Sequence, residues 1–241
     1  MANNQSQKAS VFLIPVPLAT DGLHTLPEEL KQKAIRIQYY FVENLRSARR
    51  FLKQISKDVD IDSITFMEMG ENNPPDLHTL KKWIEAGYEI GVLSEAGCPG
   101  IADPGKEIVK RAHELGAIVK PFVGPNSIIL ALMSSGFSGQ QFRFVGYLPV
   151  KDKFRKTAIQ DLELASDRNT ETQIFIETPY RNISMFEDLK RFCRPQTRLC
   201  IASMLTDSDF EWIQSKTIEE WVNSPTPDIN KRPSVFLLFT H

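Results

Sequence analysis

The sequence has few cysteines and no long apolar run, and each absence excludes a class of protein. The three cysteines among its 241 residues, Cys98, Cys193 and Cys200, are an odd and sparse set, typical of reduced thiols rather than of a disulfide framework. The longest uninterrupted apolar run covers residues 128–133, far short of the ~20 residues that span a bilayer. Residues 1–10 are polar and lack the apolar core of a secretory signal. We therefore expect a cytoplasmic protein without a membrane span.

An excess of charge of one sign is also lacking, since 29 Lys and Arg residues oppose 30 Asp and Glu residues, for a net charge of −1. Proteins that coat nucleic acid through bulk electrostatics are usually clearly basic, so only local basic groups remain to contact RNA. Two such groups occur. The first is Arg46, Arg49, Arg50 and Lys53, and the second is Lys151, Lys153, Arg155 and Lys156. A solvent-exposed helix face explains both groups equally well. The four histidines are scattered without metal-ligand spacing, so we expect no metal.

Short runs rich in Val, Ile and Phe alternate with helical patterns, which predicts α/β units. In the first half, strands are expected near 11–16, 39–43, 64–69, 89–94 and 118–123, and helices near 28–35, 44–57, 76–86, 105–115 and 127–135. In the second half, strands are expected near 142–148, 172–177, 199–205, 210–215 and 235–240, and helices near 152–165, 182–192 and 218–222. Two successive strands between 199 and 215 predict an antiparallel element and a mixed sheet. We expect two α/β domains, residues 1–122 and 123–241.

Two loops have the composition of a ligand site. Residues 94–105 join an apolar strand to a helix and contain Gly97, Gly100 and Gly105; glycines let a ligand approach the backbone, and ligands of open α/β sheets bind outside the carboxyl ends of strands. The segment is longer than the ~2–6 residues of an ordinary connection, which favours a site. The turn at 123–127 is an ordinary capped helix start or an anion site. No dinucleotide fingerprint and no P-loop occur, which disfavours nicotinamide, flavin and nucleoside triphosphate ligands.

Short motifs in a fixed order carry a resemblance that covers nearly the whole chain. They are Pro15-Val16-Pro17-Leu18, Glu43-Asn44-Leu45-Arg46, the loop 94–105, Gly124-Pro125-Asn126-Ser127, Gly146-Tyr147-Leu148-Pro149-Val150-Lys151 and Glu177-Thr178-Pro179-Tyr180-Arg181. Together they resemble the tetrapyrrole methylase superfamily of S-adenosylmethionine-dependent methyltransferases. Within it, the chain is most similar to the ribosomal RNA small-subunit methyltransferase I group, which methylates a cytidine 2′-hydroxyl of 16S rRNA.

The resemblance implies a fold, a cofactor and a partner. It implies two α/β domains with S-adenosylmethionine in the cleft between them, a homodimer, and ribosomal RNA as the substrate. For Ile128, Ile176 and Leu205, core packing is an equal alternative to cofactor contact. By motif position the cofactor would contact Pro17, Gly97, Cys98, Ile101, Ser127, Ile128, Ile176, Leu205 and Pro233.

A hydroxyl acceptor needs a positioned base. Glu43, Glu95 and Glu177 each lie near the end of a predicted strand, and Glu95 is nearest to the cofactor loop. Arg46 and Arg181 could orient a phosphate or carboxylate of the substrate. They could equally pair with Glu43 and Glu177 as structural bridges.

One segment departs from the pattern that it resembles. Where that group has R-E-L-T-K, this chain has Ser203-Met204-Leu205-Thr206-Asp207, and the tail that follows is acidic (Asp207, Asp209, Glu211, Glu219 and Glu220, against Lys216). An acidic surface repels the phosphate groups of RNA. Three hypotheses therefore stay open: an RNA methyltransferase, a small-molecule methylase of a tetrapyrrole-like substrate, and a cofactor-binding module without catalysis.

Overall fold

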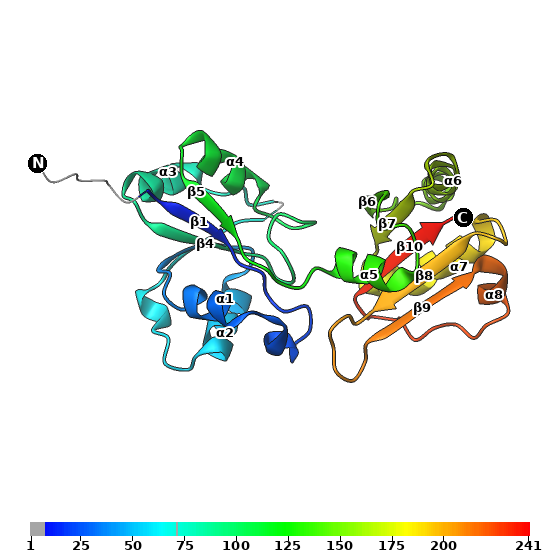
Figure 1. Cartoon of the computed structure of the whole chain (residues 1–241), viewed down its shortest axis with the longest axis horizontal. Coiled ribbons are helices and arrows are strands. Elements are labelled where there is room, and N and C mark those ends of the chain that lie inside the picture. Colours follow the sequence, from blue (N-terminus) through cyan, green and yellow to red (C-terminus); the bar gives the residue numbers. More distant parts are fainter. Residues whose placement is uncertain (1–7, 71) are drawn as a thin grey trace, which may run out of the picture. The chain divides into compact units, whose positions relative to one another are not determined.

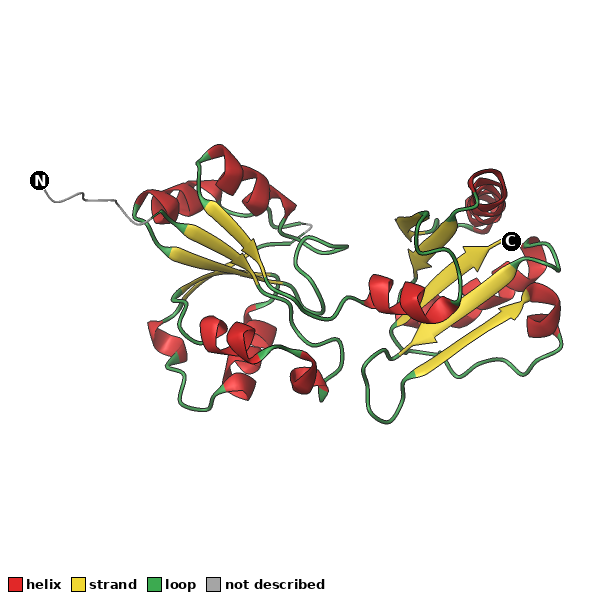
Figure 2. Cartoon of the chain, in the orientation of Figure 1, coloured by secondary structure: helices red, strands yellow, loops and turns green. Residues whose placement is uncertain are grey.

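The computed structural model describes residues 8–70 and 72–241, so most of the polar segment 1–10 lies outside the described residues. The chain forms two compact units, Met1–Pro125 and Asn126–His241 (Figure 1). Each unit contains a five-stranded sheet with helices packed on it (Figure 2). In the described residues no helix is both long enough and apolar enough to cross a membrane.

The sheet of the first unit is wholly parallel, in the order β3-β2-β4-β1-β5. Its strands are β1 (Ser10–Leu13), β2 (Tyr39–Val42), β3 (Thr65–Glu68), β4 (Glu89–Leu93) and β5 (Ile118–Pro121). Its helices are α1 (Glu28–Ala34), α2 (Leu45–Ile55), α3 (Leu77–Glu85) and α4 (Lys106–Glu114), with 3₁₀ turns η1 (Gly22–Thr25) and η2 (Ile61–Ser63). Because all strands run the same way, their carboxyl ends meet at one edge, where such sheets bind ligands.

Alternating side chains bury the two faces of this sheet separately. Tyr40 joins the core under α1 and α2, whereas its neighbour Phe41 joins the core under α3 and α4, as Figure 1 shows with the two helix pairs on opposite sides. Two of these helices, α2 and α3, begin at side-chain caps; at α2 the Asn44 side chain accepts from the Ser47 amide at 3.0 Å. This N-cap satisfies an amide that the helix itself leaves unpaired.

The second unit has a mixed sheet in the order β6-β7-β10-β8-β9, in which only β6 and β7 are parallel. The antiparallel pairing of β8 with β9 confirms the predicted mixed sheet. Helices α6, α7 and α8 contribute to one buried core, and α5 packs against β8, β9 and β10. The elements are α5 (Ser127–Ser135), β6 (Phe142–Tyr147), α6 (Asp152–Asn169), β7 (Thr172–Ile176), η3 (Pro179–Arg181), α7 (Asn182–Phe192), β8 (Arg198–Ser203), β9 (Trp212–Thr217), α8 (Ile218–Val222) and β10 (Ser234–Phe239).

The strand expected at 199–205 runs two residues past the end of β8, and the strand expected at 210–215 begins two residues before β9. Met204 and Thr206 have positive φ values of 52° and 69°, a left-handed conformation that interrupts an extended strand. The strand expected at 11–16 also ends early, at Leu13, because Pro15 has no amide to donate to a ladder. These corrections place residues 204–211 in a loop at the edge of the second sheet.

Candidate functional site

Two loops at the carboxyl edge of the first sheet are joined through Gly97. Val16 and Gly97 exchange backbone hydrogen bonds of 2.9 and 3.1 Å, which fixes the loop 94–105 to the segment after β1. Gly97 has φ +72°, and a Cβ there would lie 3.2 Å from Leu18 Cδ2. Both the backbone conformation and the space therefore require glycine at this position.

The Cys98 thiol ties the same loop to the turn after β5. Its Sγ lies 3.4 Å from the carbonyl oxygen of Pro125, so the thiol serves as a donor to that turn. In that turn a Cβ at Gly124 would collide with the Pro15 ring. The side chain of Ile101, from the far part of the loop, is 49% exposed. The structure thus brings Gly97 and Cys98 together with the segment that holds Pro17, and leaves Ile101 open to solvent.

Three carboxyl groups gather at this edge. The Glu95 amide donates to Glu43 Oε2 at 2.9 Å, and the Ser47 hydroxyl donates to Glu95 Oε1 at 3.0 Å. Burial raises the pKa of Asp103 to about 7, and the neighbouring Glu43 and Glu95 charges add to the rise. Burial also raises the pKa of Glu43. The sequence analysis did not name Asp103 as a functional residue. Its position in the loop 94–105, which also carries Glu95, is the feature of the sequence that could have pointed to it.

A small cavity of about 150 Å³ opens beside these groups within the first unit. Its lining includes Pro17, Ser47, Arg50, Ser94 and Glu95, so the proposed base and one proposed cofactor residue face the same space. Arg46, the proposed substrate residue on the same helix, is exposed. Among the described residues it forms no ion pair with Glu43, so the alternative of a structural Arg46–Glu43 bridge is not realised.

Three further predicted cofactor residues meet at one edge of the second sheet. Ile176 ends β7 and pairs in register with Val235 of β10, which follows Pro233. The Met204 amide donates to the Pro233 carbonyl at 2.9 Å, which brings Leu205 to the same edge. Thr206 Oγ1 is buried there without a hydrogen-bond partner among the described residues. Ile176, Leu205 and Pro233 therefore form one group.

Ser127 and Ile128 begin α5, whose first turn is capped by the Asn126 side chain accepting from the Ile129 amide at 3.1 Å. Ile128 and Leu205 are buried. Both side chains thus pack inside the second unit, whatever they contribute to a ligand.

Arg181 is engaged in the structural bridge considered above. Its guanidinium donates to Glu177 Oε1 at 2.7 and 3.0 Å, and the Thr178 amide donates to the same oxygen at 2.6 Å. The Glu177 side chain is fully buried, whereas that of Arg181 is 36% exposed. These contacts engage Glu177 Oε1, whereas Glu177 Oε2 is buried without a hydrogen-bond partner among the described residues. Arg181 keeps part of its surface exposed.

Arg155 does not belong to the surface group in which the sequence placed it. It is 3% exposed, forms a 2.8 Å ion pair with Asp188 and donates to the carbonyls of Pro149 and Val150. Its place on the buried side of α6 makes it a structural residue. Its neighbours Lys151, Lys153 and Lys156 are exposed.

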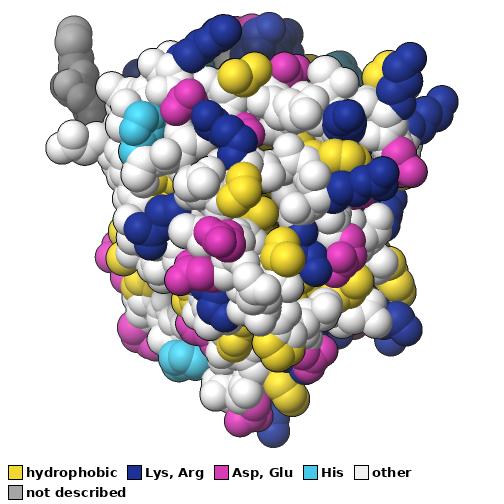
Figure 3. All heavy atoms as spheres, turned by 90° about the vertical axis from the view of Figure 1, so that its right-hand side faces the viewer, with side chains coloured by type: hydrophobic (Ala, Val, Ile, Leu, Met, Phe, Trp, Pro, Cys, Tyr) yellow, Lys and Arg dark blue, Asp and Glu magenta, His cyan; other side chains and the backbone are white. Residues whose placement is uncertain are grey.

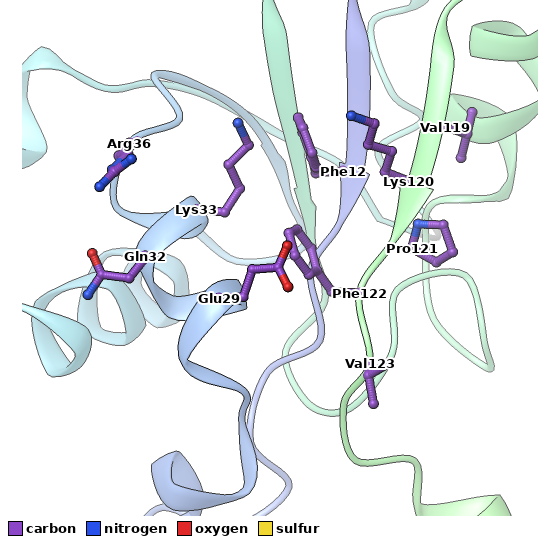
Figure 4. Close-up of a pocket in the computed structure, with 10 residues that line it drawn as sticks. All are labelled: Phe12, Glu29, Gln32, Lys33, Arg36, Val119, Lys120, Pro121, Phe122 and Val123. Atoms are coloured by element: carbon purple, nitrogen blue, oxygen red, sulfur yellow. The ribbon is translucent and has the colours of Figure 1, made fainter.

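A larger groove, of about 710 Å³, lies between α1 and β5 in the first unit (Figure 4). Phe12 and Phe122 stack at its floor with ring centroids 5.9 Å apart, and the ammonium groups of Lys33 and Lys120 lie 4.5 and 5.4 Å from the Phe12 ring. No sequence motif marks this groove. Its residues occupy helix and strand positions whose pattern is that of ordinary core packing and solvent-exposed faces.

The described residues offer no candidate metal cluster, and the face drawn in Figure 3 carries charges of both signs. The described part of the chain contains no group of three or more His, Cys, Asp and Glu residues that could hold a metal ion. On the face in Figure 3, basic and acidic side chains are interspersed, with basic ones more frequent toward its upper edge.

Comparison with known proteins confirms the resemblance. No family model matches the chain. It is 28% identical to the ribosomal RNA small subunit methyltransferase I of Vibrio cholerae over 96% of this chain and 76% of the relative. The protein of the same name from Escherichia coli O157:H7 is 27% identical over 98% and 78%, and that from Bacillus subtilis is 29% identical over 74% and 58%.

Solved structures support the fold. The methyltransferase CobJ matches with a TM-score of 0.60 and 16% identity over 96% of this chain and 93% of that one. A uroporphyrin-III-C-methyltransferase from Thermus thermophilus matches with a TM-score of 0.54 and 14% identity, over 97% and 93%. The predicted fold of two α/β units of the tetrapyrrole methylase type is confirmed, and the names of the relatives support the methyltransferase class.

Proposed function

We propose that this chain, a homologue of the ribosomal RNA small subunit methyltransferase I proteins with the fold of the tetrapyrrole methylases, transfers a methyl group from S-adenosylmethionine to a 2′-hydroxyl of ribosomal RNA. The observation that carries the proposal is the glycine-rich loop 94–105, fixed through Gly97 and Cys98 at the carboxyl edge of a parallel sheet. Such an edge is where open α/β sheets bind small ligands.

The residues present suit this cofactor. An adenine ring binds in apolar slots with a few backbone hydrogen bonds, and each unit offers such a group of residues. In the first unit Pro17, Gly97, Cys98 and Ile101 lie on or beside the fixed loop. In the second unit Ser127 and Ile128 begin α5, and Ile176, Leu205 and Pro233 meet at the sheet edge, beside the unpartnered hydroxyl of Thr206.

S-adenosylmethionine, when bound, supplies an electrophilic methyl group together with its own leaving group, so the protein's task is to position and activate the acceptor. A hydroxyl acceptor must lose its proton as the new bond forms. Glu95 is the proposed base, since its carboxylate lines the cavity beside Pro17 and its Oε1 is oriented by Ser47. Arg46 and the exposed part of Arg181 are the proposed substrate contacts.

A small-molecule methylase is the second candidate. The solved structures that match the chain include a uroporphyrin-III-C-methyltransferase, and the net charge of −1 gives no global attraction for RNA. An RNA substrate is favoured because the similarity to the ribosomal RNA methyltransferases extends over 96% of the chain. The cytoplasm, where ribosomal RNA is assembled, is then the proposed location, and a homodimer is the proposed assembly.

Mass spectrometry of ribosomal RNA nucleosides from a strain that lacks the gene tests the substrate. The proposal expects one 2′-O-methyl nucleoside to disappear and to return when the gene is restored. Calorimetric titration with S-adenosylmethionine tests the cofactor site separately, since all three hypotheses include a bound cofactor. Cofactor binding with unchanged RNA nucleosides would overturn the RNA substrate and leave the small-molecule methylase and the cofactor-binding module.

A further inference from the structure

Three aromatic side chains of the second unit are exposed at the end of β6, in the first turn of α6 and in the turn η3 that follows β7. Tyr147, Phe154 and Tyr180 are 59%, 58% and 77% exposed, whereas Phe175, Phe186 and Phe236 of the same unit are fully buried. Large aromatic groups normally enter a core, and a group of them in solvent marks an interaction site. We call Tyr147, Phe154 and Tyr180 the aromatic patch.

Hydrogen bonds hold the segments that carry the patch against one another. β6 and β7 are adjacent parallel strands, and Tyr147 pairs in register with Ile176. The Arg155 guanidinium donates to the Pro149 carbonyl at 3.0 Å and to the Ser184 hydroxyl at 3.1 Å. It thereby ties the loop after β6 and the start of α6 to the first turn of α7, which follows Tyr180. These contacts hold together the backbone segments that carry the three rings.

The patch is flanked by cations. The Lys231 ammonium lies 5.8 Å from the centre of the Tyr180 ring, and the Lys231 amide donates to the Pro179 carbonyl at 3.0 Å. Lys151 precedes α6 and Lys153 lies in its first turn next to Phe154; both are exposed, with Asp152 between them. The Glu177 carboxylate is buried and pairs with Arg181, so it does not reach the surface of the patch. The local balance is positive, in a chain whose net charge is −1.

We propose that the aromatic patch binds unpaired nucleotides of the RNA substrate by stacking, with Lys151, Lys153 and Lys231 contacting the adjoining phosphates. This inference rests on the proposed function. Aromatic side chains alternating with cations are the arrangement that recognises single-stranded RNA, because every base has a face that can stack. Tyr147 pairs in register with the proposed cofactor residue Ile176, so a bound nucleotide would lie next to the proposed cofactor position in this unit. The groove between α1 and β5 lacks this property, since its Phe12 ring is 3% exposed.

Fluorescence anisotropy with a labelled single-stranded RNA and with a duplex of the same sequence tests the patch. Tyr180→Ala and Phe154→Ala should each weaken single-strand binding by about 5-fold or more, because loss of one stacked base costs ~1–3 kcal/mol. Tyr180→Phe keeps the ring and should retain wild-type binding. Phe210→Ala removes a ring that is 52% exposed on the acidic loop and serves as the matched control. Lys153→Gln should lower the salt dependence by about one unit of slope, whereas the ring variants should leave that slope unchanged.

The outcomes separate failure of the patch from failure of the proposed function. If the wild-type protein binds RNA and the Tyr180→Ala and Phe154→Ala variants bind it with the same affinity, the patch alone is overturned. Equal weakening of single-strand and duplex binding would also overturn it, since bases in a duplex offer no face to stack. A wild-type protein that binds S-adenosylmethionine but no RNA would overturn the patch and the RNA substrate together. Thermal unfolding of each variant shows whether it has kept its fold.

Discussion

The backbone N–H of Glu95 donates to the carboxylate of Glu43 at 2.9 Å. This bond joins the segments that follow β2 and β4, two neighbouring strands of the first sheet. The Glu95 carboxylate meanwhile accepts from Ser47 at the start of α2. Glu43 therefore holds the loop, while Glu95 keeps an oriented carboxylate at the cavity beside Pro17.

Replacement of Glu95 tests its proposed role as the base. Glu95→Gln keeps the size of the side chain and removes its basicity, so the rate of methyl transfer should fall by about 10²–10⁴-fold while the affinity for S-adenosylmethionine stays unchanged. Single-turnover transfer and calorimetry measure the two quantities. Ser47→Ala, which removes only the orienting hydrogen bond, should have a smaller effect on the rate. Full activity in Glu95→Gln would exclude proton transfer by this residue.

Gly97→Val should prevent cofactor binding. Valine at φ +72° is strained, by about 1–3 kcal/mol, and its Cβ would press on Leu18, so the loop 94–105 must move. Calorimetry should show no binding in a variant whose circular dichroism is native. Gly139→Val is the control, because a Cβ at Gly139 meets nothing within 4 Å. Unchanged cofactor affinity in a folded Gly97→Val protein would show that the cofactor binds elsewhere.

Asp103 predicts a pH dependence of stability. Burial and the charges of Glu43 and Glu95 raise its pKa to about 7, so the folded protein binds this proton more tightly than the unfolded chain does. Its contribution to stability is therefore complete below the ordinary pKa of aspartate and is lost as the pH rises through about 7. Asp103→Asn should gain stability relative to wild type between pH 5 and pH 8. Urea unfolding at the two pH values measures this, and an equal difference at both would contradict the assignment.

In the loop 204–211, replacement of Asp207 and of Asp209 should have different effects on stability. The Asp207 carboxylate accepts from the amides of Asp209 and Phe210 at 3.1 and 2.9 Å, so Asp207→Lys should destabilise the second unit by about 1–3 kcal/mol. Asp209 is exposed, and Asp209→Lys should leave stability unchanged and strengthen RNA binding at low salt. Thermal unfolding and anisotropy report on the two effects. Equal stability of the two variants would show that Asp207 does not hold the loop.

The proposed homodimer is tested by light scattering at micromolar concentration, where the protein should show twice the chain mass. A monomer mass would remove the homodimer from the account.

The three cysteines are expected to be free thiols. Alkylation of the denatured, unreduced protein should therefore modify all three. Cys193 and Cys200 are buried, and burial raises the pKa of Cys200 to about 12, so the folded protein should react at Cys98 first.

Periodicity and loop composition were sufficient to predict the alternation of strands and helices and the mixed second sheet. α5, α7 and α8 begin and end at the residues expected, since the apolar spacing that defines each helix is local. The end of β1 at Leu13 has a local signal, Pro15, that the apolar pattern overrode. The end of β8 before Met204 was missed because the left-handed conformation there depends on neighbours far along the chain. Arg155 was misplaced for the same reason, since its partner Asp188 lies on another helix.

The candidate site was predictable to the extent that motifs carry it. Gly97 and Cys98 stand in a recognisable loop, and the structure adds the reasons: a positive φ at Gly97 and a thiol contact from Cys98 to the turn after β5. The raised pKa of Asp103 and the exposure of Tyr180 were beyond the sequence. The first depends on burial beside two other acids, and the second on which face of the turn after β7 is left uncovered.

Transfer of an isotopically labelled methyl group from S-adenosylmethionine to small-subunit ribosomal RNA tests the central claim most directly. The protein, the RNA and the labelled donor are incubated together, and the RNA is digested to nucleosides for mass spectrometry. The proposed function predicts label in a single 2′-O-methyl nucleoside, and loss of that label in the Glu95→Gln variant. Cofactor binding by calorimetry without any label in the RNA would contradict it.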